Sequence, residues 1–85
     1  MKEKMLNIGN GVSVSTGRIV CILPIASASK ALMARAEKQE NLIDTSGRKK
    51  KRSVILTDIG VVSISQLQPD TIRKRVDQLF GEAWS

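Results

Sequence analysis

Five consecutive basic residues are the group in this sequence best suited to bind a charged partner: Arg48, Lys49, Lys50, Lys51 and Arg52. Adjacent cations repel one another, so we expect them to project from a loop into water or to meet anions. Each phosphate that such a cation neutralises on DNA releases counterions. Gly47, directly before the run, allows the backbone to turn or to approach a ligand closely. The pattern predicts a phosphate-binding loop, and the simpler alternative is a solvated loop that keeps a small protein in solution.

Two other basic groups are weaker candidates for the same chemistry. Arg18 stands at the start of a predicted strand and would lie beside the basic run if the strands at 18–23 and 53–57 are neighbours. Otherwise it is an edge charge that discourages sheet aggregation. Residues 73–75, Arg-Lys-Arg, begin the last predicted helix and form either a solvated face or additional phosphate contacts.

Catalytic and metal-binding constellations are missing from the sequence. There is no His, which removes the commonest general base, the usual serine and cysteine triads and most catalytic zinc sites. The carboxylates are scattered, Asp44 is expected to cap backbone amides in its loop, and Cys21 is expected to be a small buried hydrophobe. We therefore predict no enzyme activity, no metal site, no cofactor and no small-molecule substrate.

Composition narrows the class of partner. The 85 residues form one small domain, and 14 basic against 8 acidic residues give a net charge of +6, which favours an anionic partner. No apolar run is long enough to span a membrane, and a single Cys forms no internal disulfide, so we expect a cytoplasmic protein. Phe80 and Trp84 are the only aromatic residues. Because single-strand binders stack bases on aromatic side chains, this composition favours the backbone of a duplex over single-stranded RNA.

Periodicity predicts the elements of the N-terminal half. Residues 4–8 begin to alternate and stop at a turn over 9–11, and residues 12–15 alternate with Val12 and Val14 inward. Residues 18–24 form a nearly continuous apolar run, which predicts a central strand ended by Pro24. Together these segments predict an antiparallel meander over residues 4–23.

The rest of the chain alternates between helix and strand patterns. A helix is expected over 28–40, capped by Ser27 or Ser29 and stopping at Asn41. Residues 53–57 and 61–65 predict a hairpin, and a second helix begins at Pro69 and ends at Gly81. The expected packing stripes are Ala28, Leu32, Arg35, Ala36 and Gln39 on the first helix, and Ile72, Val76, Leu79 and Phe80 on the second.

These elements predict an α+β fold in the order β-β-β-α-β-β-α, with a small, mostly antiparallel sheet and two helices. We expect residues 1–81 to form a single binding and oligomerisation domain, and residues 82–85 to form a short tail. Because so small a core is marginal, self-association would bury what one copy leaves exposed.

Several strings, in this order, resemble one known family. They are Leu6-Asn7-Ile8-Gly9, Arg18-Ile19-Val20 with Ile22, Leu42-Ile43-Asp44, Arg52-Ser53-Val54-Ile55 with Thr57-Asp58, and Leu67-Gln68-Pro69-Asp70-Thr71. Over roughly residues 5–76 the chain is similar to the small bacterial RemA-type extracellular matrix regulators. That resemblance implies a DNA-binding transcription regulator, connected with biofilm formation, that assembles into a ring and organises or wraps duplex DNA.

The resemblance also implies which residues contact DNA. The family's arginine before the third strand corresponds to Arg18, and its arginine pair in the later loop falls on Lys49 and Lys50, with the next basic position at Arg52. Gly47 sits one place earlier than in the family pattern, so a one-residue shift would make Arg48 and Lys49 the pair. Lysine lacks the bidentate geometry of arginine, which favours contact with phosphates over reading of bases.

The expected assembly is a homo-oligomeric ring, of about eight subunits by the family resemblance, located on the nucleoid. Several basic loops on one rim would raise avidity without new contacts. Two alternatives stay open. One is a small basic protein that binds structured RNA or belongs to a ribonucleoprotein, and the other is a scaffold whose basic loop contacts an acidic protein.

Overall fold

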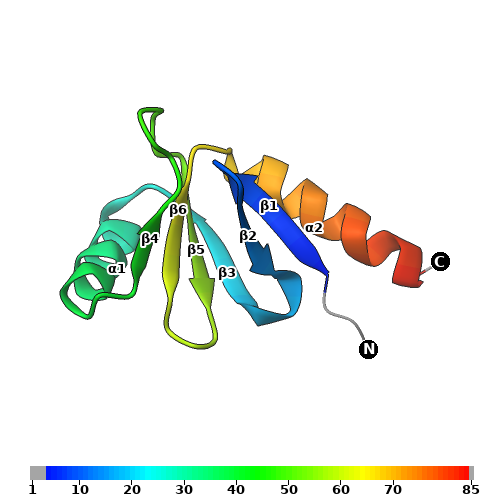
Figure 1. Ribbon diagram of the computed structural model, residues 1–85, viewed down its shortest axis with the longest axis horizontal. Coiled ribbons are helices and arrows are strands. Elements are labelled where there is room, and N and C mark those ends of the chain that lie inside the picture. Colours follow the sequence, from blue (N-terminus) through cyan, green and yellow to red (C-terminus); the bar gives the residue numbers. More distant parts are fainter. Residues whose placement is uncertain (1–3, 85) are drawn as a thin grey trace.

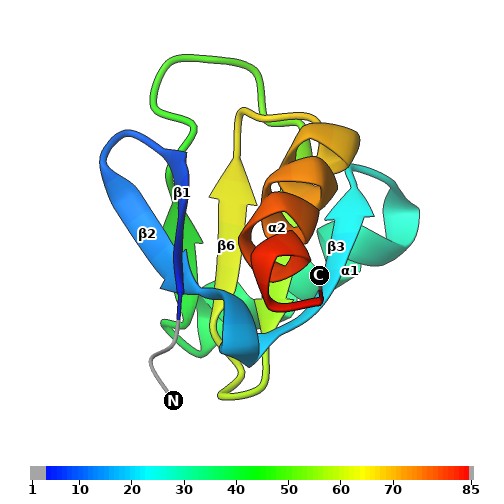
Figure 2. The same ribbon diagram turned by 90° about the vertical axis from the view of Figure 1, so that its right-hand side faces the viewer.

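Three layers make up the fold (Figure 1). A computed structural model describes residues 4–84, with side chains described for residues 4–79. A four-stranded sheet forms the middle layer, helix α1 (Ser27–Lys38) covers one face, and the hairpin of β1 and β2 together with helix α2 (Pro69–Trp84) covers the other (Figures 1 and 2). The predicted α+β class is therefore confirmed.

The middle sheet has the order β3-β5-β6-β4 and is mixed. Its strands are β3 (Ile19–Pro24), β4 (Leu42–Asp44), β5 (Ser53–Thr57) and β6 (Val62–Ser65). The predicted hairpin of β5 and β6 is confirmed, and Leu42–Asp44 is an additional strand that pairs parallel to β6. Val54 and Ile55 point to opposite faces of β5 and both are fully buried, as expected for an interior strand.

The predicted meander is wrong, because β3 leaves β2 and joins the other sheet. A short 3-10 turn over Thr16–Arg18 redirects the chain, and β3 pairs antiparallel with β5 as an edge strand. The register shifts between Ile19 and Cys21, which leaves Val20 as a bulge residue with 60% of its surface exposed. Cys21 is half-buried, not buried as expected. The continuous apolar run therefore forms an edge strand and not the predicted central one. The run is apolar because β3 supplies side chains to the core clusters on both faces of the sheet.

The first two strands form the predicted hairpin. They are β1 (Met5–Gly9) and β2 (Val12–Ser15), which pair antiparallel. Asn10 and Gly11 have φ values of 50° and 74°, as a tight two-residue turn requires. Leu6 and Ile8 are buried against Ile55 of the sheet. The alternation read from the sequence thus places this hairpin correctly on the core.

Helix α2 packs its predicted stripe beside the hairpin. Ile72 is fully buried, and Val76 and Leu79 pack against the same cluster. Pro69 occupies the first position of the helix, as expected. The helix continues past Gly81 to Trp84, so the glycine weakens it without ending it. The side chain of Phe80, the last member of the predicted stripe, lies outside the described residues.

Helix α1 packs on the sheet through a face that matches the predicted one only at Leu32 and Ala36. Ser29 and Ala36 are buried and Leu32 and Met33 are half-buried, whereas the Arg35 side chain is exposed. Ala28 and Gln39, also expected on the packing face, are exposed as well. The Ser29 hydroxyl accepts a hydrogen bond from the Ala26 amide at 2.8 Å and donates to the Pro24 carbonyl at 2.8 Å. These hydrogen bonds hold Ser29 buried at the start of the helix, and this determines which face of the helix packs against the sheet.

The end of α1 carries a strained residue. Glu40, not Asn41, takes the left-handed conformation, with φ of 59°. The Asn41 amide then donates to the Ala36 carbonyl at 2.8 Å, and the Glu40 amide donates to the Glu37 carbonyl at 3.1 Å. This is a Schellman ending, which usually has glycine at the left-handed position.

Replacing Glu40 with glycine is expected to raise the free energy of unfolding by about 0.5–1 kcal/mol, because glycine adopts this φ without steric cost. Urea unfolding monitored by circular dichroism would measure it. Glu37→Gly, inside the helix, removes the same charge and should destabilise by about 1 kcal/mol. Equal effects of the two variants would show that the backbone at position 40 is not strained.

Candidate nucleic-acid interface

Both ends of the loop that carries the basic run are hydrogen-bonded to β6. This loop, residues 45–52, joins β4 to β5 and is called the basic loop below. At its start, the amide and hydroxyl of Thr45 donate to the Ile64 carbonyl at 2.8 and 2.7 Å. At its end, the Arg52 amide donates to the Ser65 carbonyl at 2.9 Å. The loop that carries the cations is therefore held at both ends, and it extends beyond one end of the sheet (Figure 1).

The turn of the β1–β2 hairpin supports the basic loop from the side. The Asn10 side-chain amide donates to the Thr45 carbonyl at 2.8 Å. Gly47 has φ of 61°, and a Cβ atom there would lie 2.7 Å from Asn10 Nδ2. Only glycine fits this position without displacing Asn10. The sequence predicted a turn at residues 9–11 but not that this turn supports the basic loop. The one sign of that role was Asn10, whose side chain can donate a hydrogen bond.

The tip of the basic loop holds the cations in solvent. The Lys49 amide donates to the Ser46 carbonyl at 3.0 Å, which closes a turn, and residues 48–52 are all exposed. Within the part of the chain that the structure describes, four of the five side chains make no ion pair or hydrogen bond: Arg48, Lys49, Lys50 and Arg52. Their charges are available to an anionic partner.

Lys51 differs from its neighbours because it faces an acid. Its ammonium lies 3.6 Å from Asp44 Oδ2. The other Asp44 oxygen accepts hydrogen bonds from the Ser46 amide at 2.9 Å and the Ser46 hydroxyl at 2.5 Å, which confirms its expected capping role. Burial raises the pKa of Asp44, but the Ser46 hydrogen bonds and Lys51 outweigh it, so this pKa lies below its ordinary value. Asp44 thus remains ionised and holds the start of the basic loop.

Replacing Asp44 with asparagine is expected to lower stability at neutral pH and to have less effect in acid. The pKa of Asp44 is lower in the folded than in the unfolded chain, so its contribution is full above about pH 4 and is lost as the pH falls through the folded-state pKa. Urea unfolding at neutral and acidic pH would measure this. Asp77→Asn on α2 is the control, and a deficit of the Asp44 variant that persists in strong acid would contradict the assignment.

A hollow of about 280 Å³ lies where the basic loop meets the segment after β6. It is lined by Lys49, Lys50, Arg52, Gln66 and Leu67. Three of these five residues are cations, and none of the five is acidic. The hollow therefore suits an anionic group that is partly surrounded by protein.

Arg18 does not lie beside the basic loop in one copy of the chain. β3 and β5 are neighbours, but they run antiparallel, with Ile19 opposite Thr57 and Pro24 opposite Ser53. Arg18 therefore lies at the far end of β5, about 17 Å along the strand. There its guanidinium is 3.6 Å from Asp58 Oδ2. The two strands are neighbours, as the prediction required, but their antiparallel direction places Arg18 and the basic loop at opposite ends of β5.

Two of the three basic residues in the first half of α2 form hydrogen bonds to other parts of the chain. Arg73 donates to Asp70 Oδ1 at 2.9 Å and to the Ile22 carbonyl at 3.3 Å. Arg75 donates to the Asn7 carbonyl at 3.1 Å, which ties α2 to the hairpin. Lys74 is exposed. These contacts favour a structural role for both arginines over an additional phosphate site.

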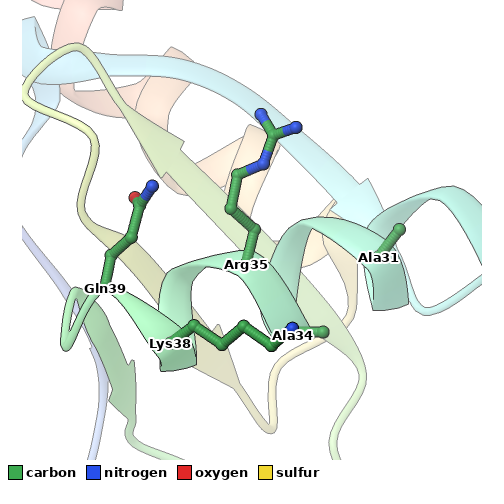
Figure 3. Close-up of a pocket in the computed structure, with 5 residues that line it drawn as sticks. All are labelled: Ala31, Ala34, Arg35, Lys38 and Gln39. Carbon is green, nitrogen blue, oxygen red and sulfur yellow. The ribbon is translucent and has the colours of Figure 1, made fainter.

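A second hollow lies on the outer face of α1 (Figure 3). Its volume is about 430 Å³, and it is lined by Ala31, Ala34, Arg35, Lys38 and Gln39. Figure 3 shows Lys38 lying along the helix toward Ala34. Only one helix contributes to it, whereas the hollow at the basic loop joins two segments distant in sequence.

Among the described residues, no group of three or more His, Cys, Asp or Glu side chains is placed to hold a metal ion. Neither helix, over its described length, is long and apolar enough to cross a bilayer.

The fold and its cationic loop define a small basic α+β domain. The chain belongs to the RemA-like family, Extracellular matrix regulatory protein A-like, whose model matches residues 5–76. It is 37% identical over 87 residues to a protein of Halalkalibacterium halodurans, covering 98% of this chain and all of the relative. It is 37% identical over 76 residues to a protein of Synechococcus sp. (strain JA-2-3B'a(2-13)), covering 88% and 85%. Both relatives are described as regulatory proteins, so the resemblance read from the sequence is confirmed.

Proposed function

We propose that this protein is a bacterial DNA-binding transcription regulator whose basic loop contacts the phosphate backbone of duplex DNA. The observation that carries the proposal is a loop hydrogen-bonded at both ends with four exposed cationic side chains that have no partner among the described residues. A fixed loop loses little conformational entropy on binding, so its charges act with less cost than those of a mobile tail. Membership of a family of regulators supports the same reading.

The loop is better suited to phosphates than to bases. Two of its uncommitted cations, Lys49 and Lys50, are point charges that match a single phosphate oxygen. Recognition would then depend on the position and deformability of the backbone, with Arg48 and Arg52 as the available bidentate groups. Lys51 would join only by exchanging Asp44 for a phosphate, an exchange with a small cost because this exposed pair is weak.

Ring assembly would bring Arg18 into the same interface. Arg18 and the basic loop lie at opposite ends of β5, so a head-to-tail arrangement places the Arg18 end of one copy near the basic loop of the next. Head-to-tail contacts close into rings when the rotation per subunit permits. The edge strands β3 and β4 have unpaired outer edges among the described residues, and Val20 and Ile43 are exposed on them. We propose such a ring, bound to DNA in the nucleoid.

Sedimentation velocity at micromolar protein is expected to show a closed oligomer of several subunits. The physical reason is that a small core and exposed apolar edges leave surface that a second copy can bury. The expected distribution has one sharp large species that persists on dilution. A single monomer at every concentration would contradict the ring.

Competition between nucleic acids tests the type of partner. The protein is bound to a labelled DNA duplex at fixed salt, and unlabelled duplex DNA, structured RNA or an acidic polypeptide is added at equal charge concentration. Duplex DNA is expected to displace the label at the lowest concentration. Displacement first by structured RNA or by the polypeptide would contradict the proposal in favour of that partner.

A further inference from the structure

Gln66 is a neutral side chain placed among the cations of the hollow at the basic loop. It follows β6 directly and lines the hollow with Lys49, Lys50 and Arg52. The side chain is half-buried. Its Cγ and Cδ atoms lie 3.7 and 3.8 Å from the position that a Cβ atom on Gly9 would occupy, so its stem packs close to the hairpin backbone.

The backbone on both sides of Gln66 is fixed by buried hydroxyl groups. The Ser65 hydroxyl donates to the Ile8 carbonyl at 2.5 Å and accepts from the Leu67 amide at 3.0 Å. The Ser53 hydroxyl donates to the Leu67 carbonyl. The backbone of Gln66 is therefore held beside the hollow.

The side-chain amide of Gln66 is uncommitted. Among the described residues it makes no hydrogen bond, although its stem is packed and the flanking residues Ser65 and Leu67 are both hydrogen-bonded. An amide has two N–H donors, and those of Gln66 are accessible from solvent, so they can donate to an acceptor that enters the hollow. Beside three cations, the acceptor that fits best is an anionic oxygen.

We propose that the Gln66 amide donates a hydrogen bond to a phosphodiester oxygen of the duplex, in the hollow where Lys49, Lys50 and Arg52 supply the charge. This inference rests on the proposed function. It adds a neutral positioning contact to an interface that the sequence showed only as charge. Glutamine amides are common donors to DNA phosphates, and such contacts fix the register of a protein on the duplex.

The salt dependence of the binding affinity distinguishes a contact made by a cation from one made by a neutral amide. A cation that meets a phosphate releases counterions, so its removal makes the plot of log affinity against log salt shallower by about 0.9. A neutral amide contributes a hydrogen bond but releases no counterion. Its removal should lower affinity by a similar factor at every salt concentration and leave the slope unchanged.

The test uses Gln66→Met in the full-length chain. Methionine keeps the length of the stem that packs near Gly9 and removes both donors. Titration of a labelled duplex at several salt concentrations is expected to show affinity about fivefold to tenfold lower with an unchanged slope, the loss typical of one hydrogen bond. Gln68→Ala, at an exposed glutamine that does not line the hollow, is the matched control and should bind as the wild type.

The outcomes distinguish this inference from the proposed function. Wild-type affinity for Gln66→Met, with weakened binding by a Lys49 and Lys50 double variant, would overturn the role of Gln66 and keep the DNA-binding loop. A changed slope for Gln66→Met would also overturn it, since the side chain would then act by placing the lysines. If neither variant alters duplex binding, the proposed function itself fails. Urea unfolding of each variant, with Gln66→Ala as a second substitution, shows that any loss is not a loss of fold.

Discussion

Replacing Lys49 and Lys50 together with alanine is expected to weaken binding to duplex DNA by roughly tenfold to a hundredfold near 0.1 M salt. Each of these exposed cations has no partner within the described residues, so each is available to neutralise one phosphate. The slope of log affinity against log salt should become shallower by about 1.8, since each lost contact removes about 0.9. Titration of a labelled duplex at several salt concentrations measures both quantities.

A matched variant separates the local contact from net charge. Lys30→Ala with Lys38→Ala removes the same two charges from exposed positions on α1, on the opposite face of the sheet from α2. It is expected to change affinity slightly, through the overall field alone, and to leave the slope near that of the wild type. Equal losses for the two double variants would show that the basic loop has no special contact with DNA.

Replacing Ser65 with alanine is expected to lower the free energy of unfolding by about 2–3 kcal/mol and to loosen the basic loop. The Ser65 hydroxyl is buried, donates to the Ile8 carbonyl and accepts from the Leu67 amide, so its removal leaves two backbone groups without partners. Urea unfolding gives the stability. Hydrogen exchange at the Arg52 amide, which donates to the Ser65 carbonyl, reports on the loop.

Ser63→Ala is the control for Ser65→Ala on the same face of the same strand. Ser63 is also buried, between Ile43 and Ile55 on the neighbouring strands, but its hydroxyl has no hydrogen-bond partner in the described part of the chain. Because an orphaned buried hydroxyl is destabilising, its removal is expected to raise stability by about 1 kcal/mol. A loss of stability from Ser63→Ala as large as that from Ser65→Ala would show that the two hydroxyls are equivalent.

Local patterns in the sequence predicted local structure well. Four correct predictions depend on residues close in the chain: the inward positions of Val12 and Val14, the Asn10-Gly11 turn, the β5–β6 hairpin and the start of α2 at Pro69. The position of β3 depends on which distant strand it pairs with. An apolar run is compatible with both a central and an edge strand, so the sequence did not distinguish them.

The cations of the candidate site were evident from the sequence, but their arrangement was not. The run at 48–52 is contiguous and was found directly. The supports from Asn10, Thr45 and Ser65 are polar residues in weak local patterns, and the contacts cross up to 57 positions of sequence. The separation of Arg18 from the basic loop follows from the antiparallel direction of β3 against β5, which no local pattern encodes.

Titration of the wild-type protein onto a labelled DNA duplex at several salt concentrations tests the central claim most directly. The account predicts tight binding at low salt, a steep fall of affinity with salt and several subunits bound per duplex, because many phosphate contacts and repeated basic loops would act together. Absence of binding at low salt, or binding that is insensitive to salt, would contradict the assignment of the basic loop as a contact to the DNA backbone.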